Sequence, residues 1–146
     1  MANEEPRAAI TIGEALEVVA TIVGNKPVDD SDAAAIQAAE MRATGATSPP
    51  IDGIGFQAQS AAMVNARRIY DEEKTTLAEV IGDATEKLES DKPVTVRDAE
   101  KVRAAELQGD VDGLESDHTD APKESVTPGG VAEALATAAN INQPPS

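Results

Sequence analysis

The stretch KPVDDSDAAAIQAAE at residues 26–40 decides how this chain folds. Its turn, Lys26-Pro27-Val28, ends any preceding helix, because a residue that comes before proline disfavours the helical region. Asp29 and Asp32 then place carboxylates where the first N–H groups of the next helix need acceptors, at the positive end of its dipole. The alanines that follow have the highest helix propensity. The stretch therefore predicts a tight turn followed by an alanine-rich helix.

A second stretch of the same design begins 66 residues later, at Lys92-Pro93-Val94. Matching residues surround the two stretches in the same order. Within the helices after the turns, the matches are Asp32-Ala33 with Asp98-Ala99 and Ala38-Ala39-Glu40 with Ala104-Ala105-Glu106. Before the turns, Ile12, Glu14 and Leu16 match Leu77, Glu79 and Ile81; after them, Gly55-Phe56 aligns with Gly130-Val131 and Asn65 with Asn140. Collinear internal matches predict a tandem repeat.

We therefore expect an all-α, marginally stable chain of two tandem copies with about three helices each. The copies cover residues 10–66 and 76–142, and residues 67–75 form a linker or helix extension. The termini, 1–9 and 143–146, are expected to be disordered. The acidic loop at 109–127 is expected to be disordered too, because it combines charge with a lack of periodicity. Strand structure is expected at most for a residue or two at the Lys-Pro-Val turns.

The first helix of each copy begins with a T-x-x-E capping box, Thr11 with Glu14 and Thr76 with Glu79. Apolar residues then recur at helical spacing and form one stripe per helix. The stripes are Ile12, Leu16, Val19 and Val23 in the first copy and Leu77, Ile81, Ala84 and Leu88 in the second. Equivalent places are expected for the two stripes. They form either the core or a face that binds a partner, and the sequence leaves both open.

In the second helix of each copy, Asp29 with Asp32 and Thr95 with Asp98 are the expected caps. The third helix is expected to start with Asp52 as its cap in the first copy, and with Thr127-Pro128 in the second. Its body is expected to run through Ala58, Ala62 and Met63 in the first copy and through Leu135, Ala138 and Ile141 in the second.

Composition limits what the chain can bind. Twelve basic and 27 acidic residues give a formal net charge of -15, which disfavours contact with nucleic acid and with anionic membranes. No apolar run is long enough to span a bilayer, and the N-terminus does not resemble a secretory signal. The expected location is the cytoplasm, with the nucleus accessible by diffusion. Of the apolar residues 27 are alanine and only two are aromatic, so any core is thin.

No catalytic, cofactor-binding or metal-binding residue is predicted. Gly129-Gly130 could cradle a phosphate before a helix, yet no basic residue stands nearby. His118 lies among acidic residues that could attract cations, but a flexible loop does not fix ligand geometry. Asp29, Asp30 and Asp32 resemble the start of a calcium loop that lacks the required glycine and final glutamate. We prefer the simpler interpretation in each case: the glycines serve helix entry or packing, and the acidic residues cap helices or are solvated in loops.

The chain resembles the seed maturation protein (SMP) family of plant late embryogenesis abundant (LEA) proteins. In the first copy the resemblance rests on TIGEALE at 11–17, the stretch at 26–40, RATG at 42–45 and QSAA at 59–62. In the second it rests on DKPVT at 91–95 with DAE at 98–100, and on PGGVA at 128–132. The resemblance implies accumulation late in seed development and a role in surviving water loss, with no catalytic residues or cofactors.

The leading hypothesis is a non-enzymatic protein that protects cellular proteins and structures during seed maturation and desiccation. Its partners would be client proteins bound without selectivity, together with self-association; nucleic acid and a membrane span are not expected. Marginal helices gain stability as water is withdrawn, since backbone groups must then pair internally. The alternative is a small folded helical module or homodimer with one specific partner.

Overall fold

The computed structural model describes residues 9–47, 52–68, 70, 74–88, 91–113 and 130–143. Helices make up most of these residues. They are α1 (Ile12–Ile22), α2 (Asp30–Thr44), α3 (Ile54–Asn65), α4 (Leu77–Ile81), α5 (Ala84–Lys87), α6 (Val96–Gly113) and α7 (Val131–Asn142). We call residues 10–65 the first half and residues 76–142 the second half. The all-α prediction is confirmed, and pairing of strand type in the described residues is limited to two isolated bridges at the Lys-Pro-Val turns.

The first helices of the two halves differ in continuity. In α1 the capping box forms as predicted, with Thr11 Oγ1 accepting from Glu14 N and Glu14 accepting from Thr11 N. In the second half the helix is interrupted at Gly82 and Asp83, which separate α4 from α5. The capping box predicted for Thr76 is wrong. There the Glu79 N–H donates to the Thr76 carbonyl in a tighter first turn, so it does not reach the hydroxyl.

The second helices, α2 and α6, begin at the caps expected from the sequence. Asp29 and Asp32 cap each other's backbone N–H groups at α2. Thr95 and Asp98 do the same at α6. Gly45, with a φ of 78°, ends α2 in the left-handed conformation that suits glycine. Because α6 continues to Gly113, the first residues of the segment expected to be a disordered loop are helical.

The third helices start later than the sequence suggested. Their N-caps are Gly53 in α3 and Gly130 in α7, and neither uses a side chain as its cap. Asp52 is therefore not the cap; the carboxylate that serves this helix end comes from α2, as described below. Thr127-Pro128 lies outside the described residues. The matching glycines are 77 residues apart, so the alignment of Gly55-Phe56 with Gly130-Val131 is wrong by two residues.

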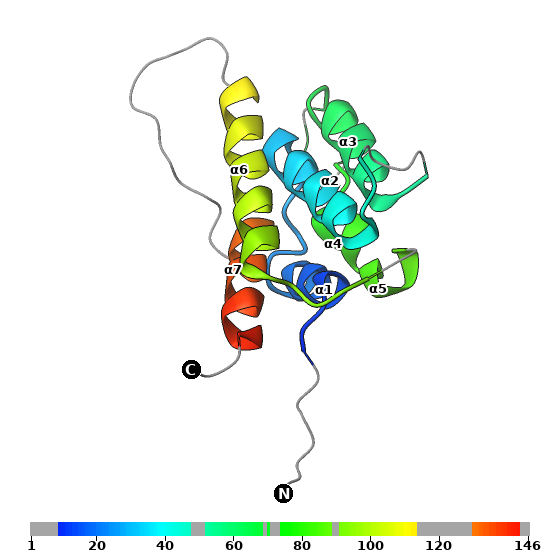
Figure 1. Cartoon of the computed structure of the whole chain (residues 1–146). Coiled ribbons are helices and arrows are strands. Elements are labelled where there is room, and N and C mark those ends of the chain that lie inside the picture. The colour runs from blue at the N-terminus through cyan, green and yellow to red at the C-terminus, as the bar shows by residue number, and fades with distance from the viewer. Residues whose placement is uncertain are drawn as a thin grey trace, which may run out of the picture.

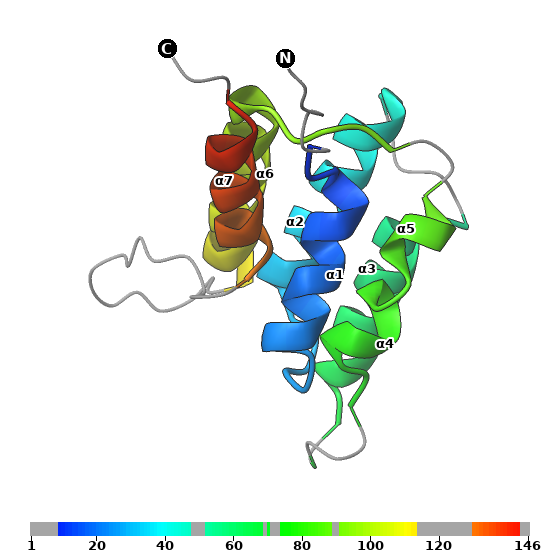
Figure 2. The ribbon, with the colours of Figure 1, turned by 90° about the horizontal axis from the view of Figure 1, so that it is seen from below.

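Four of the helices form two pairs, α2 with α3 and α6 with α7, and the two pairs pack against each other (Figure 1). α2 and α6 make the most extensive contact, and α3 packs on α2 while α7 packs on α6. α1 has few contacts with α2 of its own half. It lies between α7 on one side and α4 and α5 on the other, as the view from below shows (Figure 2). Each half thus places its first helix against the other half.

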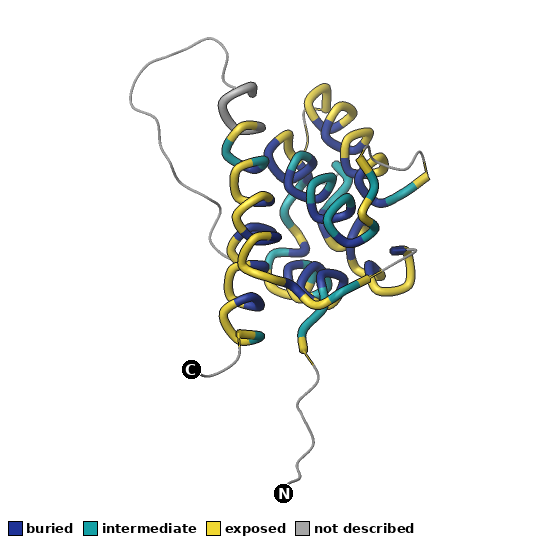
Figure 3. Tube along the Cα trace, in the orientation of Figure 1, coloured by how far each residue is buried: buried dark blue, intermediate teal, exposed yellow. Residues whose placement is uncertain are grey.

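Buried residues, dark blue in Figure 3, lie in both halves, and their apolar side chains belong to one continuous cluster. Its largest fully buried members are Ile12, Leu16, Ile36, Ile54, Leu77, Ile81 and Leu135. The stripes are core rather than a partner face. Leu77, Ile81, Ala84 and Leu88 are all buried, as are Ile12, Leu16 and Val19, while Val23 is half-buried at the end of α1. Met63 and Ile141, expected within the third-helix bodies, are exposed.

Candidate functional site: the reciprocal junctions of the two halves

The two Lys-Pro-Val turns pair with the two helix starts in a reciprocal manner. Pro27 forms an antiparallel bridge with Thr76, and Pro93 forms the corresponding bridge with Thr11. Around the first bridge, Val28 N donates to Thr75 O and Leu77 N donates to Lys26 O, at 3.0 and 2.9 Å. Around the second, Val94 N donates to Ile10 O and Ile12 N donates to Lys92 O, at 3.0 and 2.9 Å. Each turn therefore holds the start of the other half.

One asparagine closes each junction from the end of the third helix. Asn65 Nδ2 donates to Val28 O and Thr75 O, and its Oδ1 accepts from Thr75 N. Asn142 Nδ2 donates to Val94 O and Ile10 O, and its Oδ1 accepts from Ile10 N. Each side chain therefore makes three hydrogen bonds to backbone groups, and the carbonyls of Thr75 and Ile10 accept from the bridge N–H groups as well. Asn142, not Asn140, is thus the counterpart of Asn65; Asn140 is exposed.

A cluster of charged groups lies beside the second junction. Asp98 is fully buried and accepts from Lys92 Nζ, and from Arg42 Nε at 2.8 Å. Arg42 belongs to α2, so this ion pair joins the two halves. Burial alone would raise the pKa of Asp98, but hydrogen bonds from Lys92, the Thr95 backbone and Arg42 outweigh it. The pKa of Asp98 is consequently lowered from its ordinary value.

The corresponding cluster at the first junction is electrostatically different. Asp32 accepts from Lys26 Nζ at 2.5 Å, and Lys26 also donates to Asp29 at 2.9 Å. A second anion, Asp29, occupies the place that Thr95 holds in the other half. Burial, followed by the negative charge of Asp29, raises the pKa of Asp32 to about 6 despite the Lys26 ion pair. Burial opposes the charge of Lys26, but Asp32 outweighs it, so the pKa of Lys26 is raised as well.

Buried glutamates occupy the two glycine-led helix ends, where free N–H groups favour an anion. Glu40 of α2 accepts from Gly55 N of α3 at 2.8 Å, and Glu106 of α6 accepts from Ala132 N of α7 at 3.1 Å. Both side chains are about 2% exposed. A negative group at a helix N-terminus is favoured by the free N–H groups and the dipole. In this fold the chain supplies its own anion, which leaves the phosphate hypothesis for Gly130 without support.

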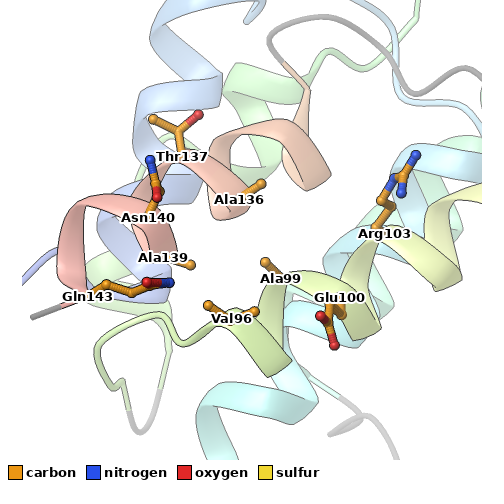
Figure 4. A pocket seen from close by; sticks show the side chains of 9 residues that line it. All are labelled: Val96, Ala99, Glu100, Arg103, Ala136, Thr137, Ala139, Asn140 and Gln143. Atoms are coloured by element: carbon orange, nitrogen blue, oxygen red, sulfur yellow. The ribbon is translucent and has the colours of Figure 1, made fainter. Parts of the chain in front are cut away.

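The surface grooves offer little chemistry. The one between α6 and α7 has a volume of about 430 Å³ (Figure 4). Its lining residues are Val96, Ala99, Glu100, Arg103, Ala136, Thr137, Ala139, Asn140 and Gln143. Within the described part of the chain, no group of three or more histidines or carboxylates could hold a metal ion. His118 and Gly129 lie outside that part. Of the aspartates that resemble a calcium loop, Asp29 and Asp32 instead cap α2 and bind Lys26.

Within the described residues, no helix is both long enough and apolar enough to cross a bilayer.

The geometry defines a class of helical protein in which buried polar side chains join two reciprocal halves. Comparison with known proteins is consistent with this division. The model of the seed maturation protein family matches residues 10–68 and again residues 75–145. The chain belongs to this family. No solved structure matches it.

Its curated relatives carry the names of late embryogenesis abundant proteins. Late embryogenesis abundant protein 47 of Arabidopsis thaliana is 52% identical over 134 residues, which are 92% of this chain and 64% of the relative. Protein D-34 of Gossypium hirsutum is 50% identical over 92% of this chain and 47% of its own length. Late embryogenesis abundant protein 31 of Arabidopsis thaliana is 49% identical over 94% of this chain and 48% of its own length. The chain spans about half to two thirds of these three relatives.

Sequence reasoning found the caps of α1, α2 and α6 but missed the side chains that bind other elements. Arg42, Asn65, Asn142, Glu40 and Glu106 all act on a different element from their own. Glu40 and Glu106 were visible as a matched pair in two alanine-rich helices, where a shared charge on an otherwise apolar face signals a specific partner. No comparable signal pointed to Arg42, because its counterpart in the second half is the neutral Gln108.

Proposed function

We propose that this chain is a non-enzymatic LEA protein that protects other proteins during seed maturation and desiccation. Membership of the seed maturation protein family is the observation that carries the proposal. We further propose that residues 10–66 and 76–142 are two copies of one unit, which the matched caps, asparagines and glutamates support. The cytoplasm, and by diffusion the nucleus, is the proposed location. Clients are proposed to be unselected proteins that water loss has destabilised.

The surface used for client contact cannot be the first-helix stripes while the protein is folded. Leu16, Val19, Leu77 and Ile81 are buried almost completely, so replacing them would disrupt the core rather than test protection. An apolar contact with a client needs exposed apolar area. We therefore assign client contact to the outer face of α3, where Phe56 and Met63 are 47% and 56% exposed.

Phe56 and Met63 lie seven residues apart, which places them on one face of the helix, two turns from each other. The equivalent positions of α7 carry Glu133 and Asn140, which are also exposed. The helix that occupies the same structural place in the other half therefore manages without apolar groups at these positions. Structural need does not explain Phe56 and Met63, and this supports a role in contact.

The α7 residues supply the test. The double variant Phe56→Glu/Met63→Asn copies them onto α3 and should leave the fold unchanged. A client enzyme is dried with the parent or the variant at equal protein mass, and its activity is measured after rehydration. We expect the variant to retain clearly less protection, because the apolar area available to an unfolding client is smaller. Circular dichroism of each protein before and after drying verifies that helix content is preserved.

A matched control makes the same chemical change elsewhere. Val18→Glu/Ile22→Asn adds one negative charge and removes exposed apolar area from α1, where Val18 and Ile22 are 47% and 62% exposed. The α3 proposal requires that this variant protect as well as the parent. If both variants protect fully, hydration or volume exclusion by an acidic polymer is the better explanation. If both variants lose protection equally, exposed apolar area contributes to protection wherever it lies on the surface.

The alternative, a folded module with one specific partner, is favoured by a separate observation. The buried cluster is continuous across both halves, which is typical of a cooperatively folded domain. A sharp thermal transition together with capture of one partner in stoichiometric amount would support the module. A broad transition with equal protection of unrelated client enzymes would support the protectant.

A further inference from the structure

The first helix of each half is covered by the opposite half. α1 packs on α4, α5 and α7, and α4 packs on α1 and α3. The side chains of Ile12, Leu16 and Val19 are fully buried by this arrangement. The backbone bridges also cross, since Pro27 pairs with Thr76 and Pro93 pairs with Thr11. A half on its own would therefore expose its stripe and leave the edge of its turn without hydrogen-bond partners.

None of these contacts requires the two halves to belong to the same molecule. We propose that a second copy of this chain can supply the opposite half, which gives a domain-swapped dimer. In that dimer the first half of each chain folds against the second half of its partner. The bridges, the hydrogen bonds of Asn65 to Thr75 and of Asn142 to Ile10, and the Arg42–Asp98 ion pair form as before, but between chains.

The connection between the halves is long enough for this exchange. Asn65 Oδ1 accepts from Thr75 N at 2.8 Å, so the two ends of the connecting segment meet in the monomer. The nine residues between them could reach roughly 30 Å when extended. This reach allows the segment to pass from one folded unit to a neighbouring one. Exchange through a connecting segment is a low-cost route to a dimer, because no new interface has to be created.

Concentration determines which form prevails. A short tether holds the two halves of one chain at an effective concentration on the order of millimolar. Swapping is therefore suppressed in dilute solution and competes once the chain itself approaches that concentration. Loss of water raises the concentration of every solute, so the dimer should form on drying. The stabilising contacts are the same in both forms, and the exchange is controlled by concentration alone.

The bridge between Pro27 and Thr76 provides a direct test in the full-length chain, which contains no cysteine. The flanking hydrogen bonds make this a non-hydrogen-bonded antiparallel pair, whose Cα atoms lie about 4.5 Å apart, within the range of disulfides. Thr76 makes no capping hydrogen bond through its side chain, so its replacement removes no cap. In Pro27→Cys/Thr76→Cys, the disulfide is intrachain in the monomer and interchain in the swapped dimer.

The reduced variant is dried, rehydrated, diluted and oxidised at once, and is then analysed by gel filtration and non-reducing electrophoresis. We expect disulfide-linked dimers at least tenfold more abundant than in a sample that was never dried. The control is the same variant oxidised before drying. Its halves are locked within one chain, so it should remain monomeric.

Three results would overturn the proposal: a chain that stays monomeric after drying, dimers that contain only intrachain disulfides, or equal dimer formation by the locked control. If circular dichroism shows that Pro27→Cys/Thr76→Cys has lost its helices, the reciprocal pair Thr11→Cys/Pro93→Cys takes its place, with the same outcomes.

Discussion

Asp32 and Asp98 occupy matching places beside the two turns, but different charges surround them. Asp98 has two cations, Lys92 and Arg42, whereas Asp32 shares Lys26 with a second anion, Asp29. Burial makes an isolated carboxylate costly, so the number of cations decides whether the ionised form is favoured. The same residue at the same structural place therefore contributes to stability with opposite dependence on pH.

We predict opposite pH profiles for Asp98→Asn and Asp32→Asn. The pKa of Asp98 is lowered in the folded state. Its contribution to the free energy of unfolding is therefore present above pH 3.8, the pKa in the unfolded state, and is lost only as the pH falls below that value. Asp98→Asn should thus cost about 1.5–3 kcal/mol throughout pH 5–8, since two half-buried cations lose their charged acceptor. For Asp32 the pKa is about 6 in the folded state and 3.8 in the unfolded state. Its contribution to the free energy of unfolding is therefore complete below pH 3.8 and is lost as the pH rises through 6.

Relative to the parent, Asp32→Asn should therefore gain up to ~3 kcal/mol between pH 4 and pH 7.5. Urea unfolding of the parent and both variants at several pH values measures this. A parallel profile for the two variants would contradict the assignment of Asp32 and Asp98 to different electrostatic environments.

A second prediction concerns Gly53, which lies against the Glu40 carboxylate. A Cβ at this position would be 1.9 Å from Glu40 Oε2, so Gly53→Ala must displace the carboxylate from Gly55 N. We expect a loss of about 2–3 kcal/mol in the free energy of unfolding, because a buried charge loses its hydrogen bond. In a Glu40→Ala background the same substitution should cost much less, since the two residues are in contact.

Gly45→Ala is the control for this double-mutant cycle. Gly45 needs its positive φ but has open space around it, so its replacement should cost about 1 kcal/mol in either background. An equal cost of Gly53→Ala with and without Glu40 would show that the carboxylate is not what excludes a side chain.

At the scale of elements, the helices are joined through their ends rather than only through their faces. Asn65 ends α3 and Asn142 ends α7, and each bonds to a turn and to the start of the other half. Glu17 of α1 likewise accepts from Thr85 N and Oγ1, and so serves the start of the short helix α5. A four-residue helix has too few internal hydrogen bonds to persist alone, so α5 depends on this contact.

We predict that Asn65→Ala and Asn142→Ala each destabilise the protein by ~2–4 kcal/mol, since each removes three hydrogen bonds to the backbone and takes the asparagine from one carbonyl of the turn and one N–H of the opposite start. The loss should be larger for Asn65, which is 4% exposed, than for the half-buried Asn142. Asn140→Ala, at an exposed place on the same helix as Asn142, should change stability by less than ~0.5 kcal/mol. Thermal unfolding followed by circular dichroism compares the three. A loss at Asn140 as large as at Asn142 would refute the structural alignment of the third helices.

For the whole molecule, the shared core predicts a single unfolding transition. Leu16→Ala in α1 and Ile81→Ala in α4 remove fully buried side chains from different halves, and each should cost ~2–5 kcal/mol. Both should lower one common midpoint, because each stripe is covered by the opposite half. Hydrogen exchange resolved by residue provides the measurement. Protection lost in only the mutated half would mean that the halves fold independently.

The elements of this fold could be predicted from the sequence far better than their arrangement. The spacing of Ile12, Leu16 and Val19 and the caps Asp29 and Thr95 are local signals, and the structure follows them. The gap in the helix after Ile81 was missed, because a single glycine is tolerated in many helices.

The pairing of the halves could not be predicted, because nothing local distinguishes a helix covered by its own copy from one covered by the other. The misplaced third-helix alignment has a related cause. Glycine and asparagine matched equally well at two offsets, and only the contacts of Glu40 and Asn65 select between them.

The reciprocal bridges also restrict how genes for such proteins can lengthen. A gene that gains a single unit by duplication would encode a first helix with no opposite half to cover it, whereas a gene that gains two would encode a second closed fold. The number of repeat units per chain should therefore change in steps of two. A chain with an odd number of units should persist only where selection tolerates its binding to other copies of the protein.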